Sequence, residues 1–252
     1  MKASAILFRF RMVCLAVIIC TGFWAPWIEF WGIGSRITLL EWLALEISRL
    51  GLLRFTVATP AVIACGALVA ALAVVFRIWG SAWLGHTVVL NSQMKANSLM
   101  ADGPYRYVRN PLYLGVFFMV AALALLMPAS GALFVLIGVP LFLFCLVLGE
   151  EAFLITQIGE PYRIYLRTVP RLFPRLRTTL MPTGNKPQWL QAVLSEINPI
   201  GVFVTIAFLS RTYDNRLMVR AILITFGISL VVRALMPTSK QSAIKQDSAL
   251  PE

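Results

Sequence analysis

The stretch GPYRYVRNPLYLG, from Gly103 to Gly115, places three tyrosines, two arginines and two prolines at the start of a long apolar block. The block runs from Leu112 to Gly149 and is broken once, at residues 128–131 (Pro-Ala-Ser-Gly). This pattern predicts a helical hairpin with two arms of roughly 17 residues, each about 25 Å long and just able to cross a membrane. We therefore expect the polar stretch to lie at one foot of a membrane hairpin.

The composition of the whole chain predicts an integral membrane protein. Of the 252 residues, 59% are hydrophobic and 13% are charged, which is too little charge to cover the surface of a soluble domain. Apolar runs outside the hairpin predict spans at about 12–31 and 56–78, and a final pair at about 199–210 and 217–236. The first span of that pair needs residues from Leu190 onward to reach full length. The expected fold class is all-α, a polytopic transmembrane helical bundle of about five or six spans.

The chain divides into four expected parts around this hairpin. An amphipathic helix is predicted at about 37–55, either on the membrane surface or packed against other spans. The expected parts are N-terminal transmembrane helices (1–79), a core around the hairpin (80–177, with the hairpin at 112–149), a linker with a C-terminal transmembrane hairpin (178–236), and a disordered tail (237–252).

The distribution of basic residues predicts the orientation in the membrane. The net charge is +11, and Lys and Arg gather before the first span, between the second span and the hairpin, and after the hairpin. The hairpin tip carries none. By the positive-inside rule, the N-terminus and the segments 80–110 and 150–195 face the cytoplasm of a multi-pass inner (cytoplasmic) membrane protein. We expect contacts with membrane lipids and no nucleic-acid binding, because no basic face is interleaved with exposed aromatics.

Metal binding is not expected from this sequence. The four cysteines lie in apolar runs without a CxxC pair, and His86 is the only histidine. We expect such cysteines to act as small buried hydrophobic side chains and not as zinc ligands or disulfide partners.

Two polar clusters are expected to converge at the feet of the hairpin, because its arms are antiparallel. One holds the tyrosines, Arg109 and Asn110, and the other holds Glu150 and Glu151. A cluster of charges at membrane level predicts a functional site, although ion pairs that only fix the helix ends would look the same in the sequence. Adjacent glutamates point about 100° apart on a helix, so both cannot face one ligand equally.

Three ordered motifs resemble the isoprenylcysteine carboxyl methyltransferase and phospholipid methyltransferase superfamily. The resemblance covers about residues 76–177 and includes FRIWGSAWLG, from Phe76 to Gly85. The matching residues are Arg109, Pro111, Tyr113 and Gly115 in the first motif, Glu150 and Glu151 in the second, and Gly159, Tyr162, Tyr165, Val169 and Pro170 in the third.

The resemblance implies an S-adenosylmethionine-dependent methyltransferase with a cytoplasmic cofactor pocket. The acceptor would be a lipid, an isoprenoid or another hydrophobic small molecule that arrives from the bilayer and offers a carboxylate, thiol or amine. Glutamates can pair with the cofactor's amino group, tyrosine faces can favour its sulfonium, and an arginine can hold its carboxylate. The implied catalytic residues are Arg109, Asn110 and Glu150, and the implied cofactor-binding residues are Gly103, Tyr105, Arg106, Tyr107, Arg109, Asn110, Pro111, Tyr113, Gly115, Glu150, Glu151 and Tyr162.

One departure from the superfamily pattern concerns Asn110, which stands where those proteins usually have histidine. Asparagine donates and accepts hydrogen bonds but does not titrate near neutral pH. A proton-transfer role at this position is therefore in doubt, whereas cofactor positioning could survive. Two alternatives remain open: a catalytically inactive membrane protein that keeps the fold and binds a lipid or a partner, and, less favoured, a transporter.

Overall fold

Every named element in the computed structural model is a helix. The structure describes residues 8–24, 37–83, 102–175, 177–181, 186–212 and 214–235. Within these ranges the only strand-like pairing is an isolated bridge between Thr38 and Pro128, so the all-α prediction is confirmed. The helices are α2 (Arg11–Phe23), α3 (Leu39–Arg49), α4 (Phe55–Trp83), η2 (Gly103–Arg106), α6 (Pro111–Ala124), α7 (Ala129–Ile158), α8 (Glu160–Thr168), α9 (Trp189–Ser195), α10 (Ile197–Val204), η3 (Thr205–Leu209), η4 (Ser210–Thr212) and α11 (Asn215–Leu235).

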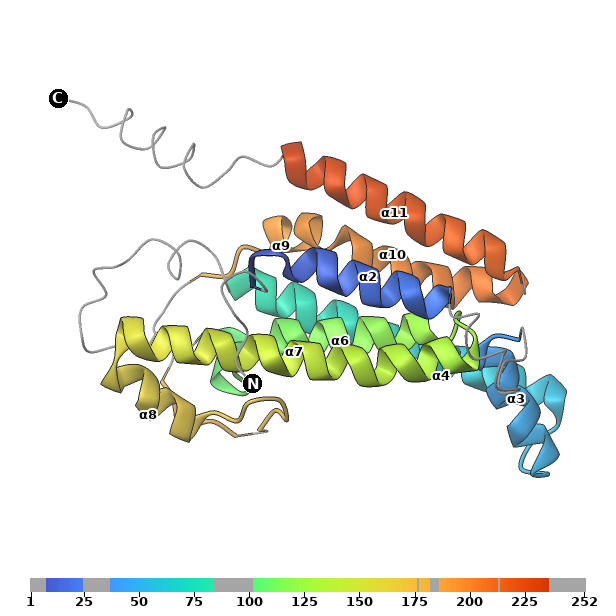
Figure 1. The fold of residues 1–252 in the computed structure, drawn as a ribbon, viewed down its shortest axis with the longest axis horizontal. Helices are drawn as coiled ribbons and strands as arrows, with labels where there is room; N and C mark the ends of the chain where they lie inside the picture. Colours follow the sequence, from blue (N-terminus) through green and yellow to red (C-terminus); the bar gives the residue numbers. More distant parts are fainter. Residues whose placement is uncertain are drawn as a thin grey trace.

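The longest helices lie side by side along one axis (Figure 1). Among the described residues, α4 and α7 are long and apolar enough to cross a membrane, and α9 with the following helix to Leu209 forms a third candidate that is bent by 64°. Helices α2 and α6 are apolar but shorter. These apolar helices make the chain an integral membrane protein.

The predicted hairpin is formed by α6 and α7, with its turn where the sequence places it. Pro128 precedes the first residue of α7. The prediction that the second arm ends at Gly149 is wrong, because α7 continues to Ile158 and has 30 residues. The segment after Gly149 contains good helix formers and no breaker, and the helix ends only at Gly159, whose φ of 77° is the left-handed conformation that glycine adopts readily.

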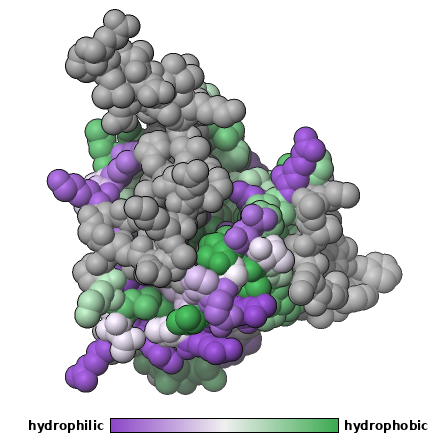
Figure 2. All heavy atoms as spheres, turned by 90° about the vertical axis from the view of Figure 1, so that its left-hand side faces the viewer, coloured by the Kyte–Doolittle hydropathy of each residue, from purple (hydrophilic) through white to green (hydrophobic). Residues whose placement is uncertain are grey.

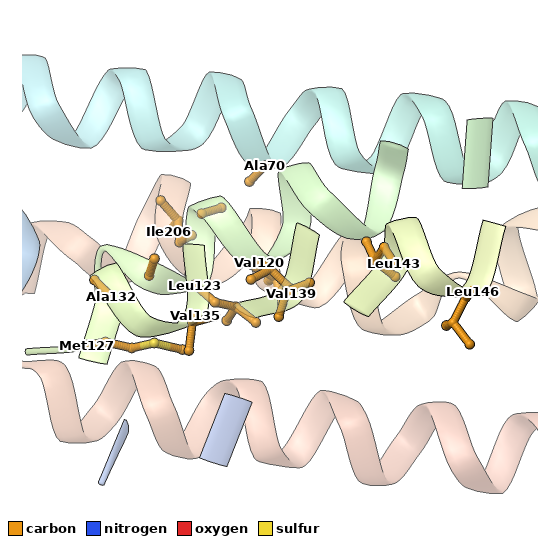
Figure 3. Close-up of a cluster of buried hydrophobic side chains, with 13 residues drawn as sticks. Ala70, Val120, Leu123, Met127, Ala132, Val135, Val139, Leu143, Leu146 and Ile206 are labelled. Carbon is orange, nitrogen blue, oxygen red and sulfur yellow. The ribbon is translucent and has the colours of Figure 1, made fainter. Parts of the chain in front are cut away.

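The hydrophobic core lies between the two arms of this hairpin and α4. Val135, Val139 and Leu143 follow one another at helical spacing on α7 and are buried against Val120 and Leu123 of α6 (Figure 3). Small buried residues on α4 allow its backbone to come close to α6, as is usual for helices packed in a membrane. The buried small residues of α4 include Ala58, Gly66, Ala70, Ala73, Gly80 and Ala82.

The predicted amphipathic helix is α3, at the end of the molecule that holds the hairpin tip (Figure 1). Thr38 and Glu41 form a capping box at its start, which satisfies backbone donors of the first turn. Its buried residues Leu40 and Ala44 pack against α4. Of the two expected placements, the structure therefore has the helix packed against another span.

The last predicted pair of spans is present in part. A helix, α11, lies where the second member is predicted, but it is not among the described helices that are long and apolar enough to cross a membrane. The first member is not a continuous helix, because the chain breaks at Glu196 between α9 and α10. Pro199 lies in the first turn of α10, where its ring would clash with the carbonyl four residues earlier if the helix ran straight through. Predictions for His86 and for the tail 237–252 fall outside the described residues.

Candidate active site

The first motif forms a short turn that leads into α6. Gly103, with a φ of 55°, begins the helical turn η2, and Pro111 is the first residue of α6. Proline suits this position because the amide of the first helical residue has no partner within the helix. The Asn110 carbonyl accepts the first helical hydrogen bond, from Leu114 N, at 3.0 Å. The Tyr105 hydroxyl donates to the Gly80 carbonyl on α4 at 3.4 Å.

The third motif folds back onto the first. After α8 the chain returns alongside α7 (Figure 1), and Arg109 N donates to the Pro170 carbonyl at 2.9 Å. The Asn110 side-chain amide donates to the Arg171 carbonyl at 3.2 Å, and Arg175 N donates to the Tyr107 carbonyl at 3.0 Å. Segments about 60 residues apart in the sequence are therefore paired at the foot of the hairpin.

Glu151 lies between two arginines, one from each of these segments. Its Oε1 accepts from Arg109 Nη1 at 2.7 Å, and Arg171 binds both carboxylate oxygens, with Nη2 at 2.7 Å from Oε2 and Nε at 3.1 Å from Oε1. Glu151 is only 6% exposed. The hydrogen bond to Glu151 raises the pKa of Arg171. All three motifs are thus joined by one buried, charge-assisted cluster, the Arg109–Glu151–Arg171 triad.

Glu150 faces a different environment from its neighbour. The Tyr113 hydroxyl of α6 donates to Glu150 Oε2 at 3.0 Å. Glu150 is partly exposed, and within the described residues no arginine or lysine pairs with it. The rotation of about 100° between adjacent helical residues separates a carboxylate bound by two arginines from one bound by a tyrosine hydroxyl.

Two tyrosines of α8 pack against the first motif. Tyr162 and Tyr165 are buried, and their ring centroids are 5.7 Å apart. The Tyr165 hydroxyl donates to the Tyr105 carbonyl at 2.8 Å. Burial raises the pKa of Tyr162 to about 12, with a smaller contribution from Glu151, and burial likewise raises the pKa values of Tyr105 and Tyr165. These phenols stay neutral at physiological pH.

Three of the predicted cofactor residues contact neighbouring segments of the chain. Arg106 donates to the Leu180 carbonyl, and the ring of Tyr107 lies 6.1 Å from that of Trp79. Gly115 lies against α4, where an added Cβ would come 2.4 Å from Arg77 Cγ. Contacts at these three positions join η2 and α6 to neighbouring segments, and their role in cofactor binding stays a prediction.

Two functional candidates were not predicted from the sequence. Arg171 belongs to a run of five arginines that nothing in the sequence separates, and only the fold shows its partner. Glu196 is 2% exposed and binds Arg77, with Oε1 at 3.0 Å from Nη2, as well as the Ser81 hydroxyl. A lone acidic residue just before an apolar segment was the available signal for Glu196.

The hydrophilic side chains of this end surround apolar ones in the view along the long axis (Figure 2). Within the described ranges, no group of three or more His, Cys, Asp or Glu side chains is placed to hold a metal ion. The described surface at the end that holds the triad is thus a mixture of hydrophilic and apolar side chains.

Comparison with known families gives one match. Residues 61–160 match the family model of phospholipid methyltransferase. This segment of the chain is therefore similar to phospholipid methyltransferases. The matched segment contains α4 from its second turn, the first motif, and α7 with both glutamates, and it ends before Tyr162. The superfamily resemblance is confirmed. No curated protein and no solved structure matches the chain.

Proposed function

We propose that this membrane protein is an S-adenosylmethionine-dependent methyltransferase whose acceptor is a hydrophobic molecule that arrives from the bilayer. The observation that carries the proposal is the phospholipid methyltransferase match over residues 61–160. We further propose that the chain crosses the membrane five or six times. The triad and the cofactor then lie on the cytoplasmic side, where basic residues concentrate. The family match favours this reading over a catalytically inactive lipid- or partner-binding protein.

The side chains at the foot of the hairpin fit the charged end of the cofactor. S-adenosylmethionine has an ammonium and a sulfonium, which seek negative charge, and a carboxylate, which seeks donors. Glu150 has a carboxylate without an arginine partner in the described part of the chain. Arg109 Nε is a buried donor without a hydrogen-bond partner there, and such a donor is costly unless something occupies it. We assign the ammonium to Glu150 and the carboxylate to Arg109.

The role of the protein residues in this reaction is alignment and water exclusion. The bound cofactor supplies an electrophilic methyl group. The triad holds Arg109 in a fixed position, and the Tyr113 hydrogen bond fixes the rotamer of Glu150. These two side chains therefore lose little conformational entropy when the reactants are aligned. Asn110 cannot take a proton from the acceptor. This favours an acceptor that is already nucleophilic, such as a carboxylate or a thiolate, over an amine, which would have to lose a proton.

Calorimetric titration of the purified protein with S-adenosylmethionine tests the binding assignment. Glu150→Gln should weaken binding about 10- to 100-fold, because a charged hydrogen bond is lost. Glu160→Gln is the matched control: Glu160 forms an exposed pair with Arg163 on α8 and should leave affinity unchanged. A wild-type protein that does not bind the cofactor would refute the proposal.

The acceptor class needs a separate experiment. Membranes that contain the protein are incubated with cofactor carrying a labelled methyl group, and the labelled lipids are extracted and identified. We expect a methyl ester or thioether on a lipid-soluble product, absent from membranes with the Glu150→Gln variant. Cofactor binding without any labelled product would instead support the inactive alternative.

A further inference from the structure

We propose that residues 169–181, the docking loop, form a surface that binds anionic lipid headgroups and inserts apolar side chains between them. The loop follows α8 and has the sequence VPRLFPRLRTTLM, with three arginines and no acidic residue. This surface is distinct from the cofactor assignment above, and its test does not depend on methyl transfer.

Two large apolar side chains of the docking loop face outward. Phe173 and Met181 are each 86% exposed. Residues 169–175 and 177–181 contain no helix, so these side chains are not the outer face of an amphipathic helix packed elsewhere. Large apolar side chains presented in this way are typical of surfaces that enter a membrane.

The loop is held in this position by the hairpin foot. Its backbone is hydrogen-bonded at Pro170 and Arg175 to the first motif, and Arg106 binds the Leu180 carbonyl. A segment fixed at three points presents its side chains with little conformational freedom to lose on binding. The outward orientation of Phe173 and Met181 is therefore a property of the fold.

The level of the loop along α7 places it beside the bilayer. The Arg171 guanidinium lies 5.6 Å from the ring centroid of Phe144, and Phe144 is an exposed residue of the membrane-spanning helix. Phe144 precedes Glu151 by about two turns, or roughly 10 Å. The loop thus lies against the edge of the apolar part of α7, where headgroups meet hydrocarbon chains.

Charge identifies the kind of headgroup. Arg175 and Arg177 are exposed, and Arg171 is partly exposed in the triad. Basic residues next to inserted apolar side chains favour anionic lipids. Lipids with phosphatidylglycerol-like headgroups complement this surface, whereas zwitterionic lipids satisfy only its apolar part.

Photo-crosslinking from position 173 tests the proposal. Phe173 is replaced by benzoylphenylalanine, the full-length protein is placed in nanodiscs with or without phosphatidylglycerol, and lipid adducts are measured by intact mass. The control position is Gln157, an exposed residue near the far end of α7. We expect adducts from position 173 and none from 157, with a yield that rises about fivefold for each engaged arginine when anionic lipid is present.

Substitution of the two exposed arginines tests the contribution of charge. Arg175→Gln with Arg177→Gln should abolish the increase caused by phosphatidylglycerol while adducts with zwitterionic lipid remain. Size-exclusion chromatography checks that the variants stay folded. Equal yields at positions 173 and 157, or a yield at 173 that ignores lipid charge, would overturn the proposal.

Discussion

Glu151 illustrates how a buried charge can hold separate segments of a site together. Two guanidiniums share its carboxylate, and they come from segments about 60 residues apart in the sequence, separated by the hairpin and α8. Removing two charges from water is costly, and good geometry repays that cost only while all partners are present. The triad should therefore be more sensitive to the loss of one member than to any conservative change around it.

Glu151→Ala tests this at the residue scale. It leaves Arg109 buried beside Arg171 without the shared carboxylate, so the free energy of unfolding should fall by about 3–5 kcal/mol. Glu150→Ala removes only a partly exposed carboxylate bonded to Tyr113 and should cost about 1 kcal/mol. Thermal unfolding in detergent measures both. Equal effects of the two substitutions would contradict the separation of roles between the glutamates.

Asn110 permits a second test with two opposite substitutions. Its side-chain amide donates to the Arg171 carbonyl, and a histidine ring nitrogen can do the same. Asn110→His should therefore keep cofactor affinity within a few-fold. Asn110→Asp places an acceptor against that carbonyl and should lower thermal stability. If the aspartate variant were as thermally stable as the wild type, the hydrogen bond to the Arg171 carbonyl would contribute nothing to stability.

At this scale, the sequence predicted which residues gather but not how they pair. The helical angle between Glu150 and Glu151 indicated that both could not face one ligand equally, and their partners do differ. The sequence could not show that Arg171 would bind Glu151, because that contact depends on the path of the chain after α8. Side-chain pairing across separate motifs requires the fold.

Helix α6 is positioned by a close approach to α4. Gly115→Ala would place a methyl group 2.4 Å from Arg77 Cγ and 3.2 Å from its backbone nitrogen. Overpacking of this kind costs about 1–3 kcal/mol, so thermal stability should fall. Gly227→Ala on α11 is the control, because nothing lies within 4 Å of its added Cβ. A Gly115→Ala variant as stable as this control would show that the two helices can separate freely.

Ionisation of Tyr162 on α8 should lower the free energy of unfolding at high pH. Burial raises the pKa of Tyr162 from 10.0 to about 12, so the folded state holds the phenolic proton more tightly than the unfolded state does. The corresponding stability is complete below pH 10 and is lost as the pH rises toward 12. Tyr162→Phe removes this group, and unfolding measured across that window should then decline less steeply. Identical slopes would rule out Tyr162 as a contributor.

At the scale of elements, apolar runs predicted the existence of the helices better than their ends. The turn at Pro128 was found, because proline and glycine mark it. The end of α7 was misplaced, because a change from apolar to polar residues at Glu150 resembles a membrane boundary and is not a helix boundary. The break at Glu196 was missed because hydropathy does not register a bend.

At the scale of the whole molecule, one ion pair connects the matched segment 61–160 to the C-terminal helices. Arg77 lies on α4 inside the matched segment 61–160, and Glu196 lies between α9 and α10, outside it. Glu196 is almost fully buried, so this contact is costly to break. The C-terminal helices are therefore fastened to the core by a specific charge interaction in addition to apolar packing.

A double-mutant cycle measures this connection. Arg77→Met and Glu196→Met should each destabilise by about 3–5 kcal/mol, because each leaves a buried charge unpaired, whereas the double variant should recover much of the loss. Thermal unfolding in detergent gives all four values. Additive losses in the double variant would mean that the two side chains act independently.

The length of α7 also fixes the depth of the triad in the bilayer. From Ala129 to Glu151 the helix rises about 33 Å, slightly more than the roughly 30 Å of the hydrocarbon core. If the hairpin tip lies at one boundary of the hydrocarbon core, the carboxylates of Glu150 and Glu151 lie just beyond the opposite boundary. In a thicker bilayer the same helix would draw Glu150 toward the lipid tails, which would raise the cost of its charge. The residue count of this helix therefore makes the surroundings of Glu150 depend on the thickness of the bilayer.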